Sequence, residues 1–237
     1  MISKTKLTAL VKEFEWQEVE RALAERPDLI SVVDERGRNW LHLCCGVNPK
    51  RGKLKAADSV KTAEVLLQRG IDINQEAFRE GAWKATPLWF AIARGENLVL
   101  AEFLLRRGSN PNYCLWAASF VENIEAIRLL VRHGADVNDT SADDESPFLF
   151  AIKWSHFDSA EGLLKLGADV NSRDAKGMTA LHCMLKKGSH RKYFAMLIAH
   201  GARGDIKNND GVTAAELMRK KRDPQFQSMA DQLRVGD

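Results

Sequence analysis

Residues 167–184 read GADVNSRDAKGMTALHCM, and most of the chain consists of variants of this stretch. Its first five residues have counterparts elsewhere: GIDIN at 70–74, GSNPN at 108–112, GADVN at 134–138 and GARGD at 201–205. The first glycines of these five segments are 38, 26, 33 and 34 residues apart along the chain. A recurring spacing of about 20 to 50 residues is typical of proteins built from stacked structural repeats. The sequence therefore predicts a repeat architecture.

A second motif precedes each of the five segments and predicts the start of a helix. It reads NWLHLCC from Asn39, TPLWFAIARG from Thr86, YCLWAASF from Tyr113, SPFLFAIKWS from Ser146 and TALHCMLKKG from Thr179, with a partial copy, DGVTAAEL, from Asp210. Threonine and serine are preferred N-cap residues, and the proline that follows Thr86 and Ser146 suits the first helical turn. One short helix is therefore expected from each copy of the motif.

A second helix is expected between the two motifs of each repeat. In one copy, apolar residues at helical spacing are followed by a glycine that can end the helix: Ile124, Ile127, Leu130, Val131 and then Gly134. Two helices of about ten residues cannot bury their apolar faces alone, but a stack of such pairs shares one continuous core. The pattern predicts a solenoid of helix pairs.

This pattern closely resembles the ankyrin repeat, with its period near 33, its T-P-L-H-x-A-like helix start and its GADVN-like exit into a turn. The match covers essentially the whole chain, and Asp34, Gly37, Asp174 and Gly177 stand where the family places finger-turn residues. The resemblance implies an all-α ankyrin-repeat solenoid of stacked antiparallel helix pairs with β-turn fingers. We expect a single domain, 1–237, with an N-terminal capping helix pair at 1–33, repeats at 34–74, 75–112, 113–138, 139–171 and 172–205, and a C-terminal cap at 206–237.

The composition favours a folded, soluble protein. The chain has 237 residues, of which 45% are hydrophobic, enough to bury a sizeable core. Its 35 Lys and Arg against 32 Asp and Glu give a net charge of +3, too small to predict binding to nucleic acid or membrane by bulk attraction. No signal peptide or membrane span is expected, and the cysteines lack a disulfide or metal pattern. We therefore expect a cytoplasmic protein with free thiols.

The histidines and cysteines do not form a pattern that predicts catalysis. The resemblance gives five of the six histidines structural positions in the repeat: His42, His133, His156, His182 and His200. Only His190 has no such explanation. The HLCC segment at 42–45 lacks the three or four converging ligands of a metal site, so packing is the preferred interpretation of its cysteines. We expect no enzyme activity, no cofactor, no metal site and no small-molecule substrate.

The resemblance also implies which residues face the concave groove. They are the seventh and eighth positions after the Thr-like residue, namely Ala93 and Arg94, Phe120 and Val121, Lys153 and Trp154, and Lys186 and Lys187. Because aromatic and arginine side chains are enriched at interface hot spots, Phe120 and Trp154 form a candidate anchor for a partner, flanked by Arg94, Lys186 and Lys187. The alternative, in which both rings fill a hole between irregular repeats, stays open. Trp89 and Trp116 are interpreted as packing residues between repeats.

Two neighbouring fingers depart from the regular length. The segment QEAFREGAWKA at 75–85 has about four extra residues and is expected to place Phe78 and Trp83 on a loop. Large apolar residues on an exposed loop indicate either a loop that folds back or a contact surface. In the next finger Asn112 runs almost directly into Leu115, because about seven residues are missing. A long finger beside a short one predicts a notch above Phe120. This hypothesis fails if Trp83 or another side chain fills the notch.

A third departure is a basic insertion, GVNPKRGKLKAAD from Gly46, which is expected to form a loop carrying Lys50, Arg51, Lys53 and Lys55. Together with RKKR at 219–222 it supports an alternative function, basic-loop binding of nucleic acid or anionic lipid headgroups. A solvated loop is the preferred interpretation.

The sequence as a whole predicts a monomeric, non-catalytic protein-binding module that engages a partner protein through its concave groove and finger tips. The candidate partner-binding residues are Trp83, Arg94, Phe120, Val121, Trp154, Lys186 and Lys187.

Overall fold

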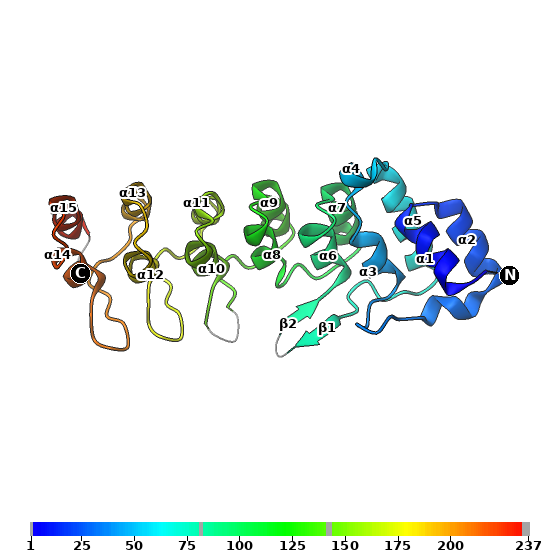
Figure 1. Cartoon of the computed structure of the whole chain (residues 1–237), viewed down its shortest axis with the longest axis horizontal. Coiled ribbons are helices and arrows are strands. Elements are labelled where there is room, and N and C mark those ends of the chain that lie inside the picture. Colours follow the sequence, from blue (N-terminus) through cyan, green and yellow to red (C-terminus); the bar gives the residue numbers. More distant parts are fainter. Residues whose placement is uncertain (1, 81–82, 141–143, 234–237) are drawn as a thin grey trace. The chain divides into compact units, whose positions relative to one another are not determined.

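The computed structural model describes residues 2–80, 83–140 and 144–233 (Figure 1). The chain groups into two compact units, Met1–Ala117 and Ala118–Asp237, which are described in turn. Helix α8 (Cys114–Phe120) contains the boundary between them. The organisation of residues 1–237 as a single domain, with the repeat boundaries given above, stays a prediction.

The first unit consists of helix pairs and one hairpin. Its elements are α1 (Lys4–Lys12), α2 (Trp16–Glu25), η1 (Pro27–Ser31), α3 (Trp40–Cys45), α4 (Pro49–Gly52), α5 (Ala56–Gln68), β1 (Ala77–Glu80), β2 (Trp83–Ala85), α6 (Pro87–Ala93) and α7 (Leu98–Arg106). Helices α1, α3 and α6 pack side by side, and α2, α5 and α7 form a second row against them. This double row buries residues such as Leu41, Leu66 and Leu104.

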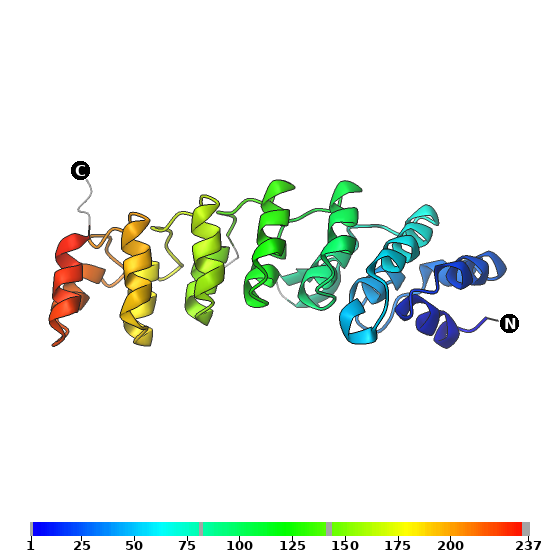
Figure 2. The ribbon, with the colours of Figure 1, turned by 90° about the horizontal axis from the view of Figure 1, so that it is seen from above.

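The second unit repeats the same arrangement. Its helices after α8 are α9 (Ile124–Arg132), α10 (Pro147–Trp154), α11 (Phe157–Lys165), α12 (Ala180–Lys187), α13 (Arg191–Ala199), α14 (Ala214–Arg219) and α15 (Pro224–Gln232). Helix α12 packs between α10 and α14 in one row, while α9 packs against α11 in the other. Seen from above, the helices of this unit lie side by side (Figure 2). The predicted all-α fold of stacked antiparallel helix pairs is confirmed.

The predicted helix ends are present where the capping residues stand. The side chain of Thr86 accepts a hydrogen bond from Trp89 N, and that of Ser146 accepts one from Leu149 N, with Pro87 and Pro147 in the first turns. Gly134, which follows helix α9, adopts a φ of +91°. These local bonds explain why the same short motif begins a helix in each repeat.

The finger turns are built by one side chain each. Asp174 Oδ1 accepts hydrogen bonds from Lys176 N and Met178 N, both at 2.9 Å, and Gly177 supplies the left-handed residue at φ +68°. Asp34 Oδ1 does the same for Arg36 N and Arg38 N, at 3.0 and 2.9 Å. The turn role that the resemblance implied for Asp34 and Asp174 is confirmed.

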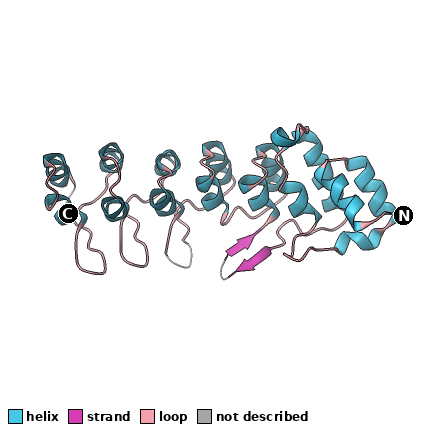
Figure 3. Ribbon diagram, in the orientation of Figure 1, coloured by secondary structure: helices cyan, strands magenta, loops and turns pink. Residues whose placement is uncertain are grey.

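The finger at 75–85 differs from the prediction. It is not a loop without strands, because β1 and β2 pair as an antiparallel hairpin, the magenta arrows of Figure 3. The ring of Phe78 stacks on Phe90 with their centroids 5.9 Å apart. Backbone pairing satisfies polar groups that a loop would leave to water, and the ring contact anchors the hairpin on helix α6. Trp83 begins β2, but its side chain lies outside the described residues.

The basic insertion also differs from the predicted loop, because residues 49–52 form the short helix α4. Asn48 caps this helix by accepting hydrogen bonds from Lys50 N and Arg51 N, and Pro49 occupies its first turn. Arg51 Nη2 lies 3.1 Å from Glu96 Oε1. The insertion is therefore partly ordered by local caps and one surface ion pair.

The short finger was predicted correctly. Helix α8 begins at Cys114, two residues after Asn112, and Tyr113 makes the turn with a φ of +65°.

Candidate functional site

The second unit carries a cluster of aromatic side chains at its surface, which we call the aromatic patch: the exposed Phe120 and Trp154 and the half-buried Phe150. The ring of Phe120 meets that of Trp154 edge to face, with centroids 5.8 Å apart and planes at 82°, and lies 6.5 Å from Phe150. Phe120 is 52% exposed and Trp154 is 57% exposed. Both rings are therefore on the surface and do not fill an interior hole, which resolves the alternative that the sequence left open.

The exposure of the aromatic patch follows from the two faces of helix α10. Phe148, Leu149 and Ile152 are buried on the core side of this helix. Helical spacing places Phe150 and Trp154, four residues apart, together on the opposite side. The helix stops at Ser155, which adopts the left-handed conformation at φ +65°. The chain therefore holds a tryptophan at the solvent-facing end of a rigid helix.

One edge of the aromatic patch is polar. His156, which stands between helices α10 and α11, places Nδ1 2.9 Å from Glu122 Oε1, and its ring lies edge to face with Phe120 at 5.8 Å. Glu122 adopts a φ of +51° in the turn after helix α8. This pair holds the turn that carries Val121 beside Phe120.

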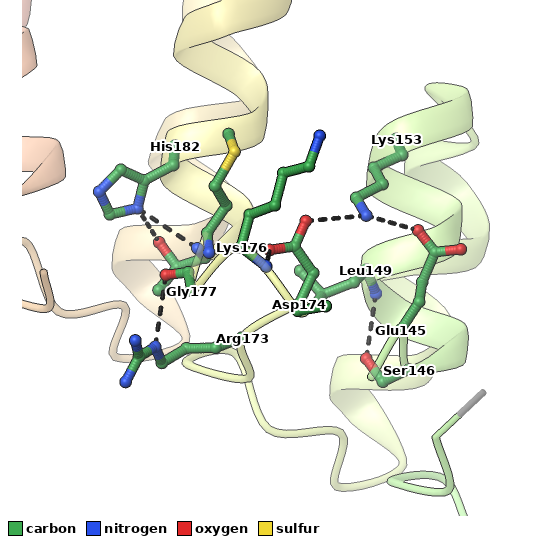
Figure 4. A network of polar contacts seen from close by, with 12 residues as sticks. Glu145, Ser146, Leu149, Lys153, Arg173, Asp174, Lys176, Gly177 and His182 are labelled. Carbon is green, nitrogen blue, oxygen red and sulfur yellow. Dashed lines mark hydrogen bonds and ion pairs between the residues drawn. The ribbon is translucent and has the colours of Figure 1, made fainter. Parts of the chain in front are cut away.

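Lys153 does not face a partner freely, although the sequence placed it in the groove row. Its Nζ lies 2.8 Å from Glu145 Oε1 and 3.0 Å from Asp174 Oδ2 (Figure 4). Burial acts to lower the pKa of Lys153, but the hydrogen bonds to Glu145 and Asp174 outweigh it and raise that pKa. The pKa of Asp174 is lowered, because its bonds to Lys153 and Met178 N outweigh burial. Lys153 thus links helix α10 to the next finger turn.

The two lysines at the end of helix α12 behave differently from each other. Lys187 Nζ donates a hydrogen bond to the backbone oxygen of Lys153 at 2.7 Å, so this side chain reaches toward the helix that carries Trp154. Lys186 is exposed. Of the lysines predicted to flank the aromatic patch, Lys187 is the one that contacts helix α10, which carries Trp154.

The other two predicted contact residues, Arg94 and Trp83, belong to the first unit. Arg94 is exposed at the end of helix α6. The side chain of Trp83 lies outside the described residues, so the notch predicted above Phe120 stays a prediction.

The histidines of the helix-start motif are structural. His42 is fully buried and its Nε2 lies 3.2 Å from the backbone oxygen of Ala85, while its Nδ1 accepts a hydrogen bond from Asn39 N. His182 Nε2 likewise lies 3.1 Å from the oxygen of Val212. Each ring donates through Nε2 to the backbone of the following finger, so these histidines join neighbouring repeats.

Stability is expected to fall in mild acid because His42 is buried uncharged. Burial lowers the pKa of His42 from 6.5 to about 4, so its contribution is complete above pH 6.5 and is lost as the pH falls toward 4. Urea unfolding should show a loss of about 2 kcal/mol between pH 7.5 and pH 5 from this residue. His182, whose pKa burial also lowers, adds to the loss.

Asp34 and Asp174 do not contribute to this loss of stability between pH 7.5 and pH 5, because their pKa values are lowered from an ordinary value near 3.8. The variant His42→Gln should have a smaller pH dependence between 7.5 and 5. An equal free energy of unfolding at both pH values in the unmodified protein would contradict this account.

His190, which had no explanation from the sequence, is the N-cap of helix α13. Its Nδ1 accepts a hydrogen bond from Lys192 N at 3.2 Å. Its position before the helical segment 191–199 could have predicted this N-cap role, but histidine is not among the preferred N-cap residues.

The cysteines show no reactive setting. All four are free and buried, and burial raises the pKa of Cys114 to about 12 and that of Cys183 to about 11. Across residues 2–80, 83–140 and 144–233, no group of three or more metal-ligating side chains gathers.

The tryptophans assigned to packing lie in the first unit. Trp89 meets Phe90 edge to face at 5.3 Å, and Trp116 lies 6.0 Å from Tyr113. The indole nitrogen of Trp116 is buried without a hydrogen-bond partner in the described structure.

No helix in the described part of the chain combines the length and apolar character needed to cross a bilayer.

Comparison with known families and proteins identifies the repeat. Two family models match: "Ankyrin repeats (3 copies)" over residues 88–174 and "Ankyrin repeats (many copies)" over residues 151–198. Transient receptor potential cation channel subfamily A member 1 of Drosophila melanogaster is 24% identical over 94% of this chain and 19% of its own length. Putative ankyrin repeat protein FPV031 of fowlpox virus is 36% identical over 43% of this chain and 30% of its own length. The chain thus spans less than a third of the length of each of these two relatives.

Solved structures show the same fold. The ankyrin repeat domain of Bcl-3 matches with a TM-score of 0.76 and 19% identity, over 98% of this chain and 100% of that one. The human ASB11 ankyrin repeat domain matches with a TM-score of 0.73 and 18% identity, over the full length of both chains.

Proposed function

Because this chain is an ankyrin-repeat protein, we propose that it is a non-catalytic protein-binding module that holds a segment of a partner protein on the aromatic patch. The proposed contact residues are Phe120, Val121, Trp154, Lys186 and Lys187. Arg94 and Trp83 remain predicted contacts. In this proposal the protein works as a monomeric scaffold in the cytoplasm, and it binds through its concave groove and finger tips.

The observation that carries the proposal is the exposure of Phe120 and Trp154 in mutual contact. Solvent-facing positions of a helix ordinarily carry polar side chains, and large exposed apolar patches mark interaction sites. Tryptophan is enriched among interface hot spots, because a rigid ring buries a large area at little cost in conformational entropy.

The chemistry of the surroundings indicates a partner segment that is both apolar and acidic. Lys187 is ordered against the backbone of Lys153, and Lys186 is exposed beside it. Complementary charge at the rim of an apolar contact contributes to specificity and association rate. An apolar side chain on the aromatic patch with a carboxylate near these lysines fits this arrangement.

The test is alanine substitution at Phe120 and Trp154. Each substitution should weaken partner binding by about 2 kcal/mol, roughly 30-fold, measured by calorimetry with a partner found by affinity purification. Folding should be preserved, because both side chains are half exposed.

The matched controls are Tyr113→Ala and Val99→Ala, which remove exposed apolar side chains of the first unit. They should leave the affinity unchanged. A partner that binds the Phe120→Ala, Trp154→Ala double variant as tightly as the unmodified protein would exclude the aromatic patch as the site.

A further inference from the structure

A second candidate site lies in the first unit, in a cavity of about 490 Å³. It is bordered by helices α1, α3 and α6, the first finger and strand β1. The side chains used below are Lys12, Arg36, Arg38, Phe78, Trp89 and Arg94. We call this cavity the cationic pocket. Its volume is in the range that accommodates several side chains of a bound ligand.

The lining of the cationic pocket is one-sided in charge. It holds four cationic side chains, and no carboxylate is among the described lining residues. His42, which also lines it, is uncharged near neutral pH because burial lowers its pKa to about 4. Charges of one sign in a partly enclosed cavity with apolar walls strengthen the local potential.

Neighbouring acidic residues offset only part of this charge. Arg38 is bound by Asp34, with Nε and Nη2 at 2.7 and 2.6 Å from Oδ2. For Arg36, Arg94 and Lys12, no ion pair to a described residue is present within 4.0 Å. Three cations are therefore available to a ligand.

The arginines are held in place by an aromatic ring. The guanidinium carbon of Arg36 lies 5.3 Å from the centroid of Phe78, and that of Arg38 lies 5.8 Å from it. The ring is in turn stacked on Phe90. An arginine stacked on a ring keeps its planar donors ordered for two-point recognition of a carboxylate.

The cationic pocket also has apolar walls. Phe78 and Trp89 line it together with Leu43 and Val47. A ligand of charge alone would leave these surfaces uncovered. A ligand that carries a bulky apolar group next to its negative charges covers both.

We propose that the cationic pocket binds an acidic peptide segment of a partner protein, with carboxylates at Arg36 and Arg94 and a bulky apolar residue against Phe78 and Trp89. Extended nucleic acid fits less well, because the whole chain has a net charge of only +3 and the cations gather in one cavity. This inference deepens the proposed protein-binding function and rests on residues of the first unit, of which only Arg94 is also a predicted contact of that function.

The experiment measures fluorescence anisotropy of a labelled peptide of about a dozen residues with four glutamates and one tryptophan, titrated with the full chain at low salt. The Arg36→Ala, Arg94→Ala double variant should bind at least tenfold more weakly than the unmodified chain. The control Arg132→Ala, Arg222→Ala removes two exposed arginines of the second unit and should stay within twofold. Thermal unfolding verifies that both variants are folded.

Peptide changes test the two halves of the proposal separately. Replacing the glutamates by glutamine should abolish binding, and replacing the tryptophan by alanine should weaken it severalfold. No binding of the acidic peptide, or an equal loss in the two double variants, would overturn the proposal. A single-stranded DNA or anionic vesicle that binds more tightly than the peptide, with the same dependence on Arg36 and Arg94, would also overturn it.

The outcomes are separable from those of the proposed function. If Phe120→Ala, Trp154→Ala abolishes partner binding while the cationic pocket binds no acidic peptide, only this inference fails. If the acidic peptide binds through Arg36 and Arg94 while the aromatic patch proves irrelevant to the partner, only the proposed location of the function fails.

Discussion

Gly95→Ala is expected to destabilise the first unit by about 3 kcal/mol, because the added methyl group has no room. A Cβ at this position would lie 2.3 Å from the backbone oxygen of Cys45 and 3.2 Å from that of Val47. Backbone atoms cannot rotate away as the end of a side chain can. The turn between helices α6 and α7 would have to move away from helix α3, and chemical denaturation would report the loss.

Gly162→Ala is the matched control, since this glycine lies inside helix α11. Its added Cβ would meet only the side chain of Ile124, at 3.4 Å, an ordinary contact distance. Alanine is a better helix former than glycine by about 1 kcal/mol, so the control should be neutral or stabilising. Equal losses in the two variants would contradict the steric explanation.

His42→Ala is expected to cost about 4 kcal/mol, the second large effect. The substitution removes the Nε2 donor from the oxygen of Ala85 and the Nδ1 acceptor from Asn39 N, both buried. Each unsatisfied buried group costs about 1 to 3 kcal/mol, and the space left by the ring adds a cavity cost.

Urea unfolding at pH 7.5 measures this effect, with His133→Ala as the control. His133 is only half buried at the end of helix α9, so its removal should cost less than about 1 kcal/mol. A His42→Ala variant as stable as the control would show that the bond to the next finger contributes little.

The fold was predictable because its determinants are local. Thr86 and Ser146 cap helices through their own neighbours, and Asp174 closes a turn within five residues. Such bonds depend on spacing along the chain, and spacing is visible in a sequence. The finger at 75–85 was mispredicted because its strands pair with each other and its Phe78 ring depends on Phe90, a contact that no local spacing encodes.

The candidate site was only partly predictable. The positions of Phe120 and Trp154 were identified from the repeat register, but their exposure depends on what the neighbouring helices leave uncovered. Lys153 occupies the same repeat position as Phe120, yet its ammonium group is held in ion pairs with Glu145 and Asp174. These two carboxylates come within reach only when the finger folds beside helix α10. The cationic pocket was not predicted, because Arg36 and Arg94 are 58 positions apart in the chain. They line the same cavity only once the repeats have stacked on one another.

The repeat, the helix starts, the turn residues and the shortened finger could be predicted from the order of the residues alone, since capping and turn formation act over a few residues. The folded structure was needed to show which aromatic rings remain on the surface, which lysine is held in ion pairs and which arginines line one cavity. Those properties are set by contacts between repeats, and the identity of a residue does not reveal which neighbours the folded chain will bring to it.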